Sequence, residues 1–131
     1  VDCFKDLQND STRMIFVARG LRKSEEDYYI AKIEYKPEDD VLAYDAVAII
    51  VNINATDSLF TIAKIKNLLN GTSNIPVVMD GNNATSTVRF LQDSVLHGEP
   101  FGKNVVAANG SEAVVEAVSK NANAIGFVGS S

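Results

Sequence analysis

The stretch PVVMDGNNATSTVRFLQDSVL, residues 76–96, places a strand pattern, a turn and a helix pattern in direct succession. Its apolar start, Pro76–Met79, predicts a short buried strand, and Asp80–Asn83 are typical turn residues. Three apolar residues then recur at helical spacing: Val88, Leu91 and Val95. The order of strand, turn and helix predicts one unit of an α/β fold.

Three hydroxyl side chains stand where this helix is expected to begin: Thr85, Ser86 and Thr87. The first backbone N–H groups of a helix have no partner within the helix, and the positive end of the helix dipole lies there. Hydroxyl and N–H donors gathered at such a point can hold an anion such as phosphate. The alternative is that Thr85 or Ser86 only caps the helix, because serine and threonine are common N-caps.

Strand and helix patterns alternate along the rest of the chain. We expect strands at residues 14–18, 41–52, 76–79, 104–108 and 124–128. We expect helices at residues 24–32, 62–69, 85 to about 96, and 112–120, with the tail of another at 4–7. Three hydroxyl residues are predicted to begin or cap these helices: Ser24, Thr61 and Ser111.

This alternation predicts an α/β fold with a mainly parallel sheet. The strands are apolar without alternation, which is typical of a sheet with helices on both faces. In such folds, ligands bind beyond the carboxyl ends of the strands. Residues 80–87 follow such an end, so the sequence places a candidate ligand site there.

The composition argues against several classes of protein. A net charge of −5 and the lack of a large Lys/Arg cluster argue against a nucleic-acid-binding surface. No apolar run approaches the roughly 20 residues that span a bilayer. The single cysteine, Cys3, can form no internal disulfide and cannot build a zinc site. It is either a small core residue or, near the start of a mature chain, the attachment point of a lipid.

The residue types that most often perform catalysis do not form a coherent set. His97 is the only histidine, and no serine or cysteine nucleophile is visibly paired with it. The acidic runs Asp39-Asp40 and Glu25–Asp27 fall in a turn and at a helix start, so we interpret them as solvated charges. The sequence therefore predicts no enzyme, no cofactor and no metal site.

Five segments in a fixed order give the chain a resemblance to a known family. They are DAVAIIVN (residues 45–52), TIAKIKNLLNG (61–71), NATSTVRF (83–90), AVVEAV (113–118) and AIGFVG (124–129). Together they resemble the phosphate-binding component of bacterial ABC phosphate importers, which is a type 2 periplasmic binding protein. The resemblance extends over nearly the whole chain.

The resemblance implies that two α/β lobes close over phosphate, which hydroxyls and N–H groups at helix starts hold. It assigns ligand contacts to Thr85, Ser86, Thr87, Arg89 and Arg19. Arg89 follows the binding turn, and Arg19 would come from the first lobe. In a register one residue earlier, the turn would be Ala84–Ser86.

The chain also departs from the family pattern, and the departures suggest a fragment. The strand that opens the first lobe would precede Val1, and the chain stops at Ser131, where the family returns to that lobe. The glycine of the binding turn is absent, and Asp80-Gly81 stand in place of an arginine. We expect residues 1–45 to form part of the first lobe with part of the connection between lobes, and residues 46–131 to form the second lobe.

The sequence thus predicts a non-enzymatic, extracytoplasmic protein that binds an oxyanion such as phosphate in the periplasm or at the cell surface. The ligand would pass to the membrane subunits of an ABC transporter. Asp80 is either an acceptor for a protonated ligand or only a turn residue. Two other functions stay open: a sensing or interaction domain of the same fold, and a small α/β enzyme that acts on a phosphorylated substrate. As a fragment, the chain would expose an apolar edge that favours self-association.

Overall fold

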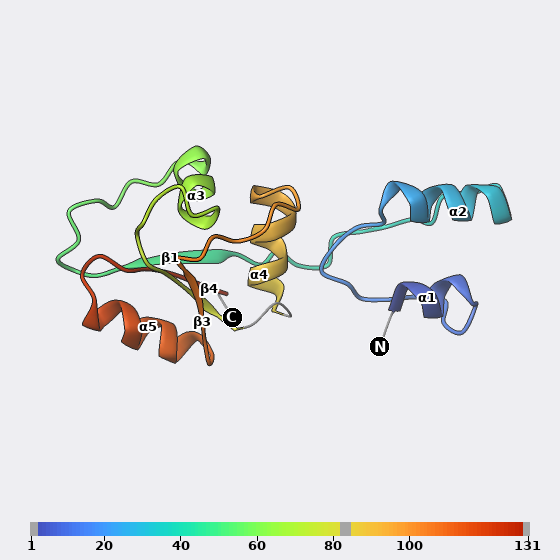
Figure 1. The fold of residues 1–131 in the computed structure, drawn as a ribbon. Coiled ribbons are helices and arrows are strands. Elements are labelled where there is room, and N and C mark those ends of the chain that lie inside the picture. The colour runs from blue at the N-terminus through green and yellow to red at the C-terminus, as the bar shows by residue number, and fades with distance from the viewer. Residues whose placement is uncertain (1–2, 82–84, 130–131) are drawn as a thin grey trace. The chain divides into compact units, whose positions relative to one another are not determined.

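The structure is a computed structural model that describes residues 3–81 and 85–129. The chain divides into two compact units, one that ends at Tyr44 and one that begins at Asp45 (Figure 1). We call them unit 1 and unit 2. That they are parts of two different lobes stays a prediction.

Unit 1 contains two helices, α1 (Cys3–Gln8) and α2 (Lys23–Ile33). The start of α2 differs from the prediction, because the residue that precedes the helix is Arg22 and not Ser24. The Glu25 carboxylate accepts a hydrogen bond of 2.7 Å from the Arg22 backbone N–H. Glu25 therefore satisfies the N–H of Arg22, the residue in the cap position. With Ser24 as the cap, that N–H would lie outside the helix.

Two predicted strands are wrong in whole or in part. Residues 14–18 form no strand, and the side chains of Met14 and Phe16 are both 68% exposed. The predicted strand at 41–52 is reduced to β1 (Val47–Val51). Strands need a neighbour to pair their N–H and C=O groups. Within the described part of the chain, β1 pairs with another strand, whereas residues 14–18 and 41–46 do not.

Unit 2 contains a sheet of four strands in the order β1-β4-β2-β3. The other strands are β2 (Val77–Asp80), β3 (Val105–Ala108) and β4 (Ile125–Gly129). β2 is parallel to both β3 and β4, and β1 is antiparallel to β4. This confirms the predicted mainly parallel sheet.

Helices cover both faces of this sheet, as predicted. α3 (Ile62–Leu69) and α4 (Ser86–Phe90) lie on one side, and α5 (Ser111–Lys120) lies on the other (Figure 1). α4 continues without a break into the π-helix η1 (Leu91–Val95). The larger core packs α3, α4 and η1 against the sheet around Phe127, and the smaller core packs Val114 and Val118 of α5 against the opposite face.

The two predicted hydroxyl caps of unit 2 differ in the structure. The Thr61 hydroxyl accepts a hydrogen bond of 3.2 Å from the Lys64 N–H, which confirms the cap of α3. Ser111 is instead the first residue of α5, Gly110 takes the cap position, and no side chain satisfies a donor there. Gly110 has a φ of 88°, a conformation that glycine adopts without strain.

We therefore predict unequal effects from two matched substitutions. Thr61→Ala should lower the free energy of unfolding by about 1 kcal/mol, because it removes a cap hydrogen bond. Ser111→Ala should change it by less than about 0.5 kcal/mol, as is usual for an exposed residue without such a role. Urea unfolding at an unchanged m-value measures both. Equal losses would contradict the difference between the two caps.

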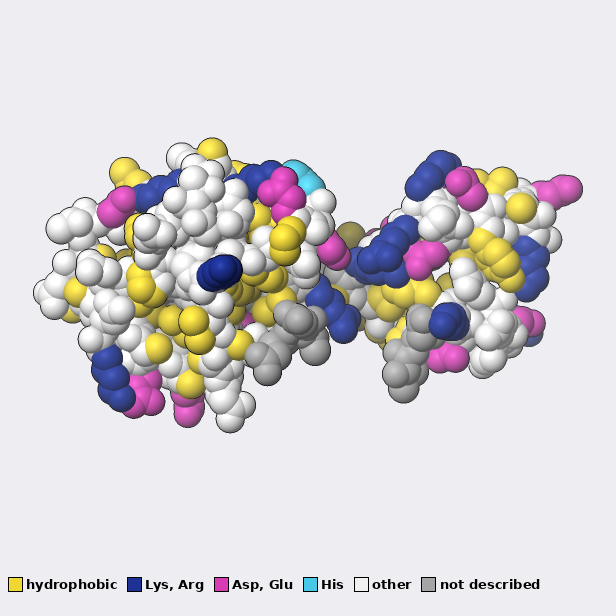
Figure 2. Space-filling view, in the orientation of Figure 1, with side chains coloured by type: hydrophobic (Ala, Val, Ile, Leu, Met, Phe, Trp, Pro, Cys, Tyr) yellow, Lys and Arg dark blue, Asp and Glu magenta, His cyan; other side chains and the backbone are white. Residues whose placement is uncertain are grey.

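Unit 1 exposes many large apolar side chains, and Tyr29 is the only buried residue among its described positions. The exposed set comprises Met14, Phe16, Val17, Tyr28, Ile30, Ile33, Tyr35, Val41, Leu42 and Tyr44. Figure 2 shows hydrophobic side chains at the surface of both units. Exposed apolar surface of this extent is typical of a surface that another polypeptide covers.

We predict that the chain self-associates as its concentration rises. Sedimentation velocity should show a coefficient that increases with concentration, and the double variant Phe16→Ser, Leu42→Ser should reduce that increase. A single monomeric species for the unaltered chain at every concentration would refute the prediction.

Candidate functional site

The turn after β2 lies at the edge where the carboxyl ends of the parallel strands meet. In the strand register, Asp80 stands opposite Ala108 at the end of β3, and Met79 stands opposite Phe127 of β4. α4 begins after this turn. Thr85, Ser86 and Thr87, the candidate residues at the start of α4, therefore follow the edge where α/β sheets bind their ligands.

Thr85 caps α4, as the sequence allowed. Its hydroxyl oxygen accepts a hydrogen bond of 3.3 Å from the Val88 N–H, and its backbone is extended, with φ −76° and ψ 156°. A hydroxyl that accepts a hydrogen bond still has its own proton to donate. Capping and ligand binding by Thr85 are thus compatible.

The other predicted residues of the turn differ in exposure. Ser86 and Arg89 are exposed, whereas Thr87 is only 2% exposed. The Thr87 hydroxyl lies 3.3 Å from Asp80 Oδ2, to which it donates. Thr87 therefore directs its hydroxyl proton to the protein itself. Ala84, the first residue of the alternative register, lies outside the described residues.

Asp80 makes a connection that the sequence did not predict. Besides Thr87, its Oδ2 accepts a hydrogen bond of 3.0 Å from the backbone N–H of Gly129 at the end of β4. Its second oxygen, Oδ1, is buried and has no hydrogen-bond partner in the described part of the chain. Local pattern cannot reveal this contact, since Asp80 and Gly129 are separated by 49 positions.

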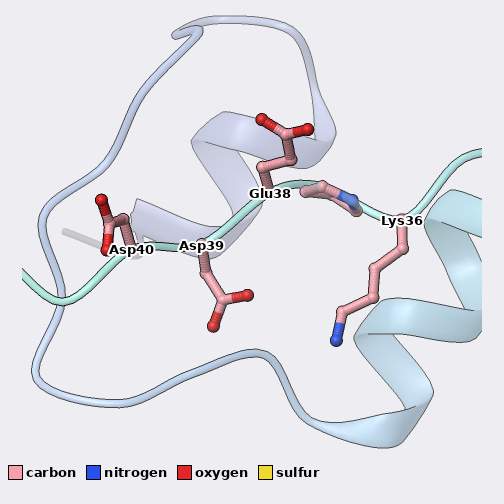
Figure 3. A pocket seen from close by; sticks show the side chains of 5 residues that line it. Lys36, Glu38, Asp39 and Asp40 are labelled. Carbon is pink, nitrogen blue, oxygen red and sulfur yellow. The ribbon is translucent and has the colours of Figure 1, made fainter.

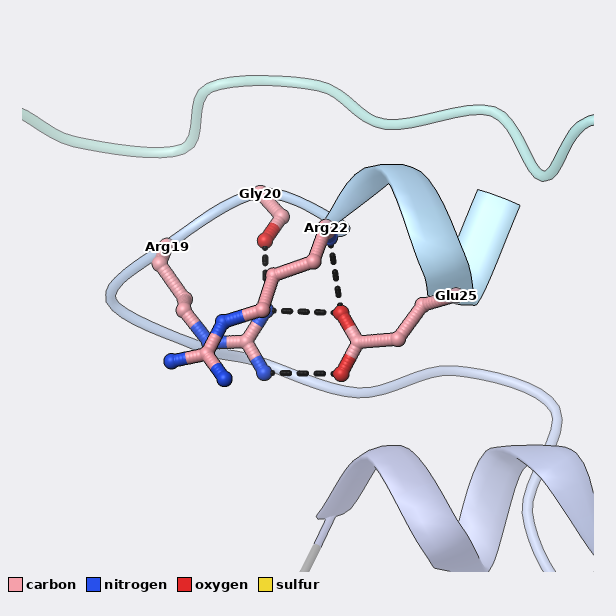
Figure 4. Close-up of polar contacts among 4 residues, drawn as sticks. All are labelled: Arg19, Gly20, Arg22 and Glu25. Carbon is pink, nitrogen blue, oxygen red and sulfur yellow. Dashed lines mark hydrogen bonds and ion pairs between the residues drawn. The ribbon is translucent and has the colours of Figure 1, made fainter. Parts of the chain in front are cut away.

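Arg19, the candidate from unit 1, is held by its own neighbours. Its guanidinium donates to both oxygens of the Glu25 carboxylate, at 2.8 and 2.9 Å, and to the Gly20 carbonyl at 2.8 Å (Figure 4). The same group lies 3.8 Å from the centre of the Phe4 ring. The two hydrogen bonds to Glu25 have the bidentate geometry in which an arginine binds a carboxylate most strongly. A ligand contact for Arg19 stays a prediction.

The environment of Glu25 favours its charged form. The hydrogen bonds from Arg19 lower its pKa to about 2, and the hydrogen bond from the Arg22 N–H acts in the same direction. Glu25 thus holds both the loop that carries Arg19 and the first turn of α2.

A shallow pocket runs along residues 36–40. Its carboxylates, from Glu38, Asp39 and Asp40, point in different directions (Figure 3). Glu38 accepts a hydrogen bond from the Tyr35 hydroxyl, and Asp40 accepts one from the Val41 N–H. No cluster of three or more potential metal ligands occurs in residues 3–81 and 85–129. None of the helices described there is long and apolar enough to cross a lipid bilayer.

Unit 2 has an α/β fold, with a mainly parallel sheet between helices on both faces. The model of the PBP superfamily domain matches residues 2–131. The chain therefore belongs to the PBP, or periplasmic binding protein, superfamily. No curated protein matches the chain significantly.

Several solved structures share the fold. PstS from Borrelia burgdorferi has a TM-score of 0.77 and 21% sequence identity, with 97% of this chain and 54% of that chain covered. A putative phosphate ABC transporter substrate-binding protein from Clostridium perfringens, solved with bound phosphate, has a TM-score of 0.63, 21% identity and the same coverage, 97% and 54%. A phosphate-binding protein from Stenotrophomonas maltophilia has a TM-score of 0.50 and 16% identity, with 96% and 50% covered. This chain thus spans about half the length of these structures.

The Glu25 geometry predicts a defined pH dependence. Because folding lowers the pKa of Glu25 from an ordinary value of 4.5 to about 2, its contribution to stability is complete above pH 4.5. The contribution should disappear as the pH falls from about 4.5 towards 2. Denaturant unfolding of the unaltered chain and of Glu25→Gln, followed by tyrosine fluorescence, should give a stability difference that shrinks across this window. A difference that stays constant from pH 7 to pH 2 would refute the assignment.

Proposed function

We propose that this chain binds an oxyanion, with phosphate as the first candidate, through the turn at Thr85–Thr87. The observation that carries the proposal is the position of this hydroxyl-rich turn at the carboxyl edge of the parallel strands, in a member of the PBP superfamily. The bound phosphate in the Clostridium perfringens structure supports the choice of ligand.

Each residue of the turn has a stated role in this proposal. Thr85 and Ser86 donate their hydroxyl protons, the backbone N–H groups of Ser86 and Thr87 add two donors, and Arg89 supplies positive charge. The next two N–H groups are already used, because that of Val88 donates to the Thr85 hydroxyl and that of Arg89 to the Thr85 carbonyl. Hydroxyl and N–H donors fixed in this way bind an anion without a large basic surface.

The whole protein would act outside the cytoplasm and deliver its ligand to the membrane subunits of an ABC transporter. In that protein, Arg19 would contribute from the first lobe. Two of the similar solved structures, from Clostridium perfringens and Stenotrophomonas maltophilia, are named as binding proteins, which supports binding rather than catalysis. Release of phosphate from a phosphorylated substrate at this turn would favour an enzyme instead.

We predict that substitutions in the turn weaken phosphate binding. A hydrogen bond to an ionised partner contributes about 1.5–3 kcal/mol, so Ser86→Ala and Arg89→Ala should each weaken binding by roughly ten- to a hundredfold. Thr85→Ala should weaken it as well and also lower stability by about 1 kcal/mol, because Thr85 caps α4. Calorimetric or NMR titration of the chain with inorganic phosphate measures the affinity, and thermal unfolding without phosphate measures the stability.

Lys103→Ala is the control for loss of a positive charge. Lys103 is exposed and lies before β3, at the opposite edge of the sheet from the turn, so its removal should leave phosphate affinity unchanged. If Ser86→Ala and Arg89→Ala bind phosphate as tightly as the unaltered chain, the turn is structural and the proposed site is wrong.

A further inference from the structure

Asp80 joins three segments that meet at the proposed binding turn. It is the last residue of β2, and its Oδ2 accepts hydrogen bonds from the Thr87 hydroxyl in the first turn of α4 and from the Gly129 N–H at the end of β4. Gly129 in turn stands opposite Val47, the first residue of β1. One carboxylate oxygen thus connects the turn to the strand pair at one side of the sheet.

A carboxylate at this place requires an explanation. Its negative charge opposes the binding of an anion a few residues away. Its Oδ1 is buried without a hydrogen-bond partner in the described part of the chain, and burial of an unpaired polar atom lowers stability. A glycine, which has no side-chain charge or polar atom, would incur neither cost. The two hydrogen bonds that Oδ2 accepts, from Thr87 and Gly129, are the stabilising interactions that offset these costs.

We propose that Asp80 is a positioning residue for the oxyanion site. Its Oδ2 holds the Thr87 side chain, and through it the first turn of α4, against the end of β4. Because the Thr87 hydroxyl proton is donated to Asp80, only the backbone N–H of Thr87 is left to donate to the ligand. The donors of residues 85–87 then keep one spacing in the absence of the ligand, which lowers the entropic cost of binding. This inference rests on the proposed function.

Two substitutions at Asp80 separate its charge from its hydrogen bonds. Asp80→Asn and Asp80→Ala both remove the negative charge, but only asparagine retains an oxygen that can accept from Thr87 and Gly129. If Asp80 positions the turn, Asp80→Ala should bind inorganic phosphate at least tenfold more weakly than Asp80→Asn. If Asp80 acts through its charge alone, the two variants should bind phosphate equally, and both more tightly than the unaltered chain.

The partner side of the link gives a second comparison. Thr87→Val keeps the shape of the side chain and removes the hydroxyl, so it should weaken phosphate binding in the same way as Asp80→Ala. Both changes break the same link, so their effects on phosphate affinity should not add. The affinity of the double variant Asp80→Ala, Thr87→Val should be at most about twofold lower than that of the single variant with the lower affinity. Losses that multiply in the double variant would show independent effects and overturn the proposal.

Amide hydrogen exchange without phosphate tests the link separately from the function. The exchange rate of the Gly129 amide should be higher in Asp80→Ala than in the unaltered chain. In Asp80→Asn, which retains an accepting oxygen, the rate should stay as low as in the unaltered chain. Equal Gly129 exchange in all three proteins would refute the link, whatever the affinity for phosphate. The expected exchange rates with equal phosphate affinities in the two variants would leave Asp80 with a purely structural role and overturn the inference. The expected exchange rates in a chain that binds no phosphate would refute the proposed function, and the positioning role with it.

Discussion

The burial of β4 is the constraint on which the rest of unit 2 depends. This strand lies between β1 and β2, and all four residues from Ile125 to Val128 are buried. Phe127 fills the core under α3, α4 and η1, whereas Val128 packs in the core under α5. A Cβ atom on Gly126 would lie 2.6 Å from the Val114 side chain, so α5 packs directly on the strand. The position of β4 thus fixes both helical layers.

The same strand connects the core to the candidate site. β4 continues to Gly129, whose N–H donates to Asp80, and Asp80 also accepts from Thr87. A chain of contacts therefore runs from the most deeply buried part of the sheet to the first turn of α4. The turn depends on the fold for its geometry, although its hydroxyl residues are neighbours in sequence.

The sequence predicted the elements whose signal is local. The strand pattern at 76–79 and the helix at 62–69, with its apolar face and Thr61 cap, were found close to their predicted bounds. The failures at residues 14–18 and 41–46 have one cause, because a strand exists only where another strand pairs with it, and apolar composition does not reveal the partner. The hydroxyl cluster of the site was likewise local, whereas the contact of Asp80 with Gly129 arises only from the folded sheet.

From the π-helix η1 we expect this region to tolerate the loss of one residue. The Leu96 N–H donates to the Leu91 carbonyl five residues earlier, and both leucines are buried, at 0% and 3% exposure. In an ordinary α-helix, residues four apart share a face. In η1 the two buried leucines are five residues apart, one more than the four-residue spacing of an α-helix. Related chains that lack one residue here could form an ordinary helical turn and keep the same core, since the difference would lie on the exposed side.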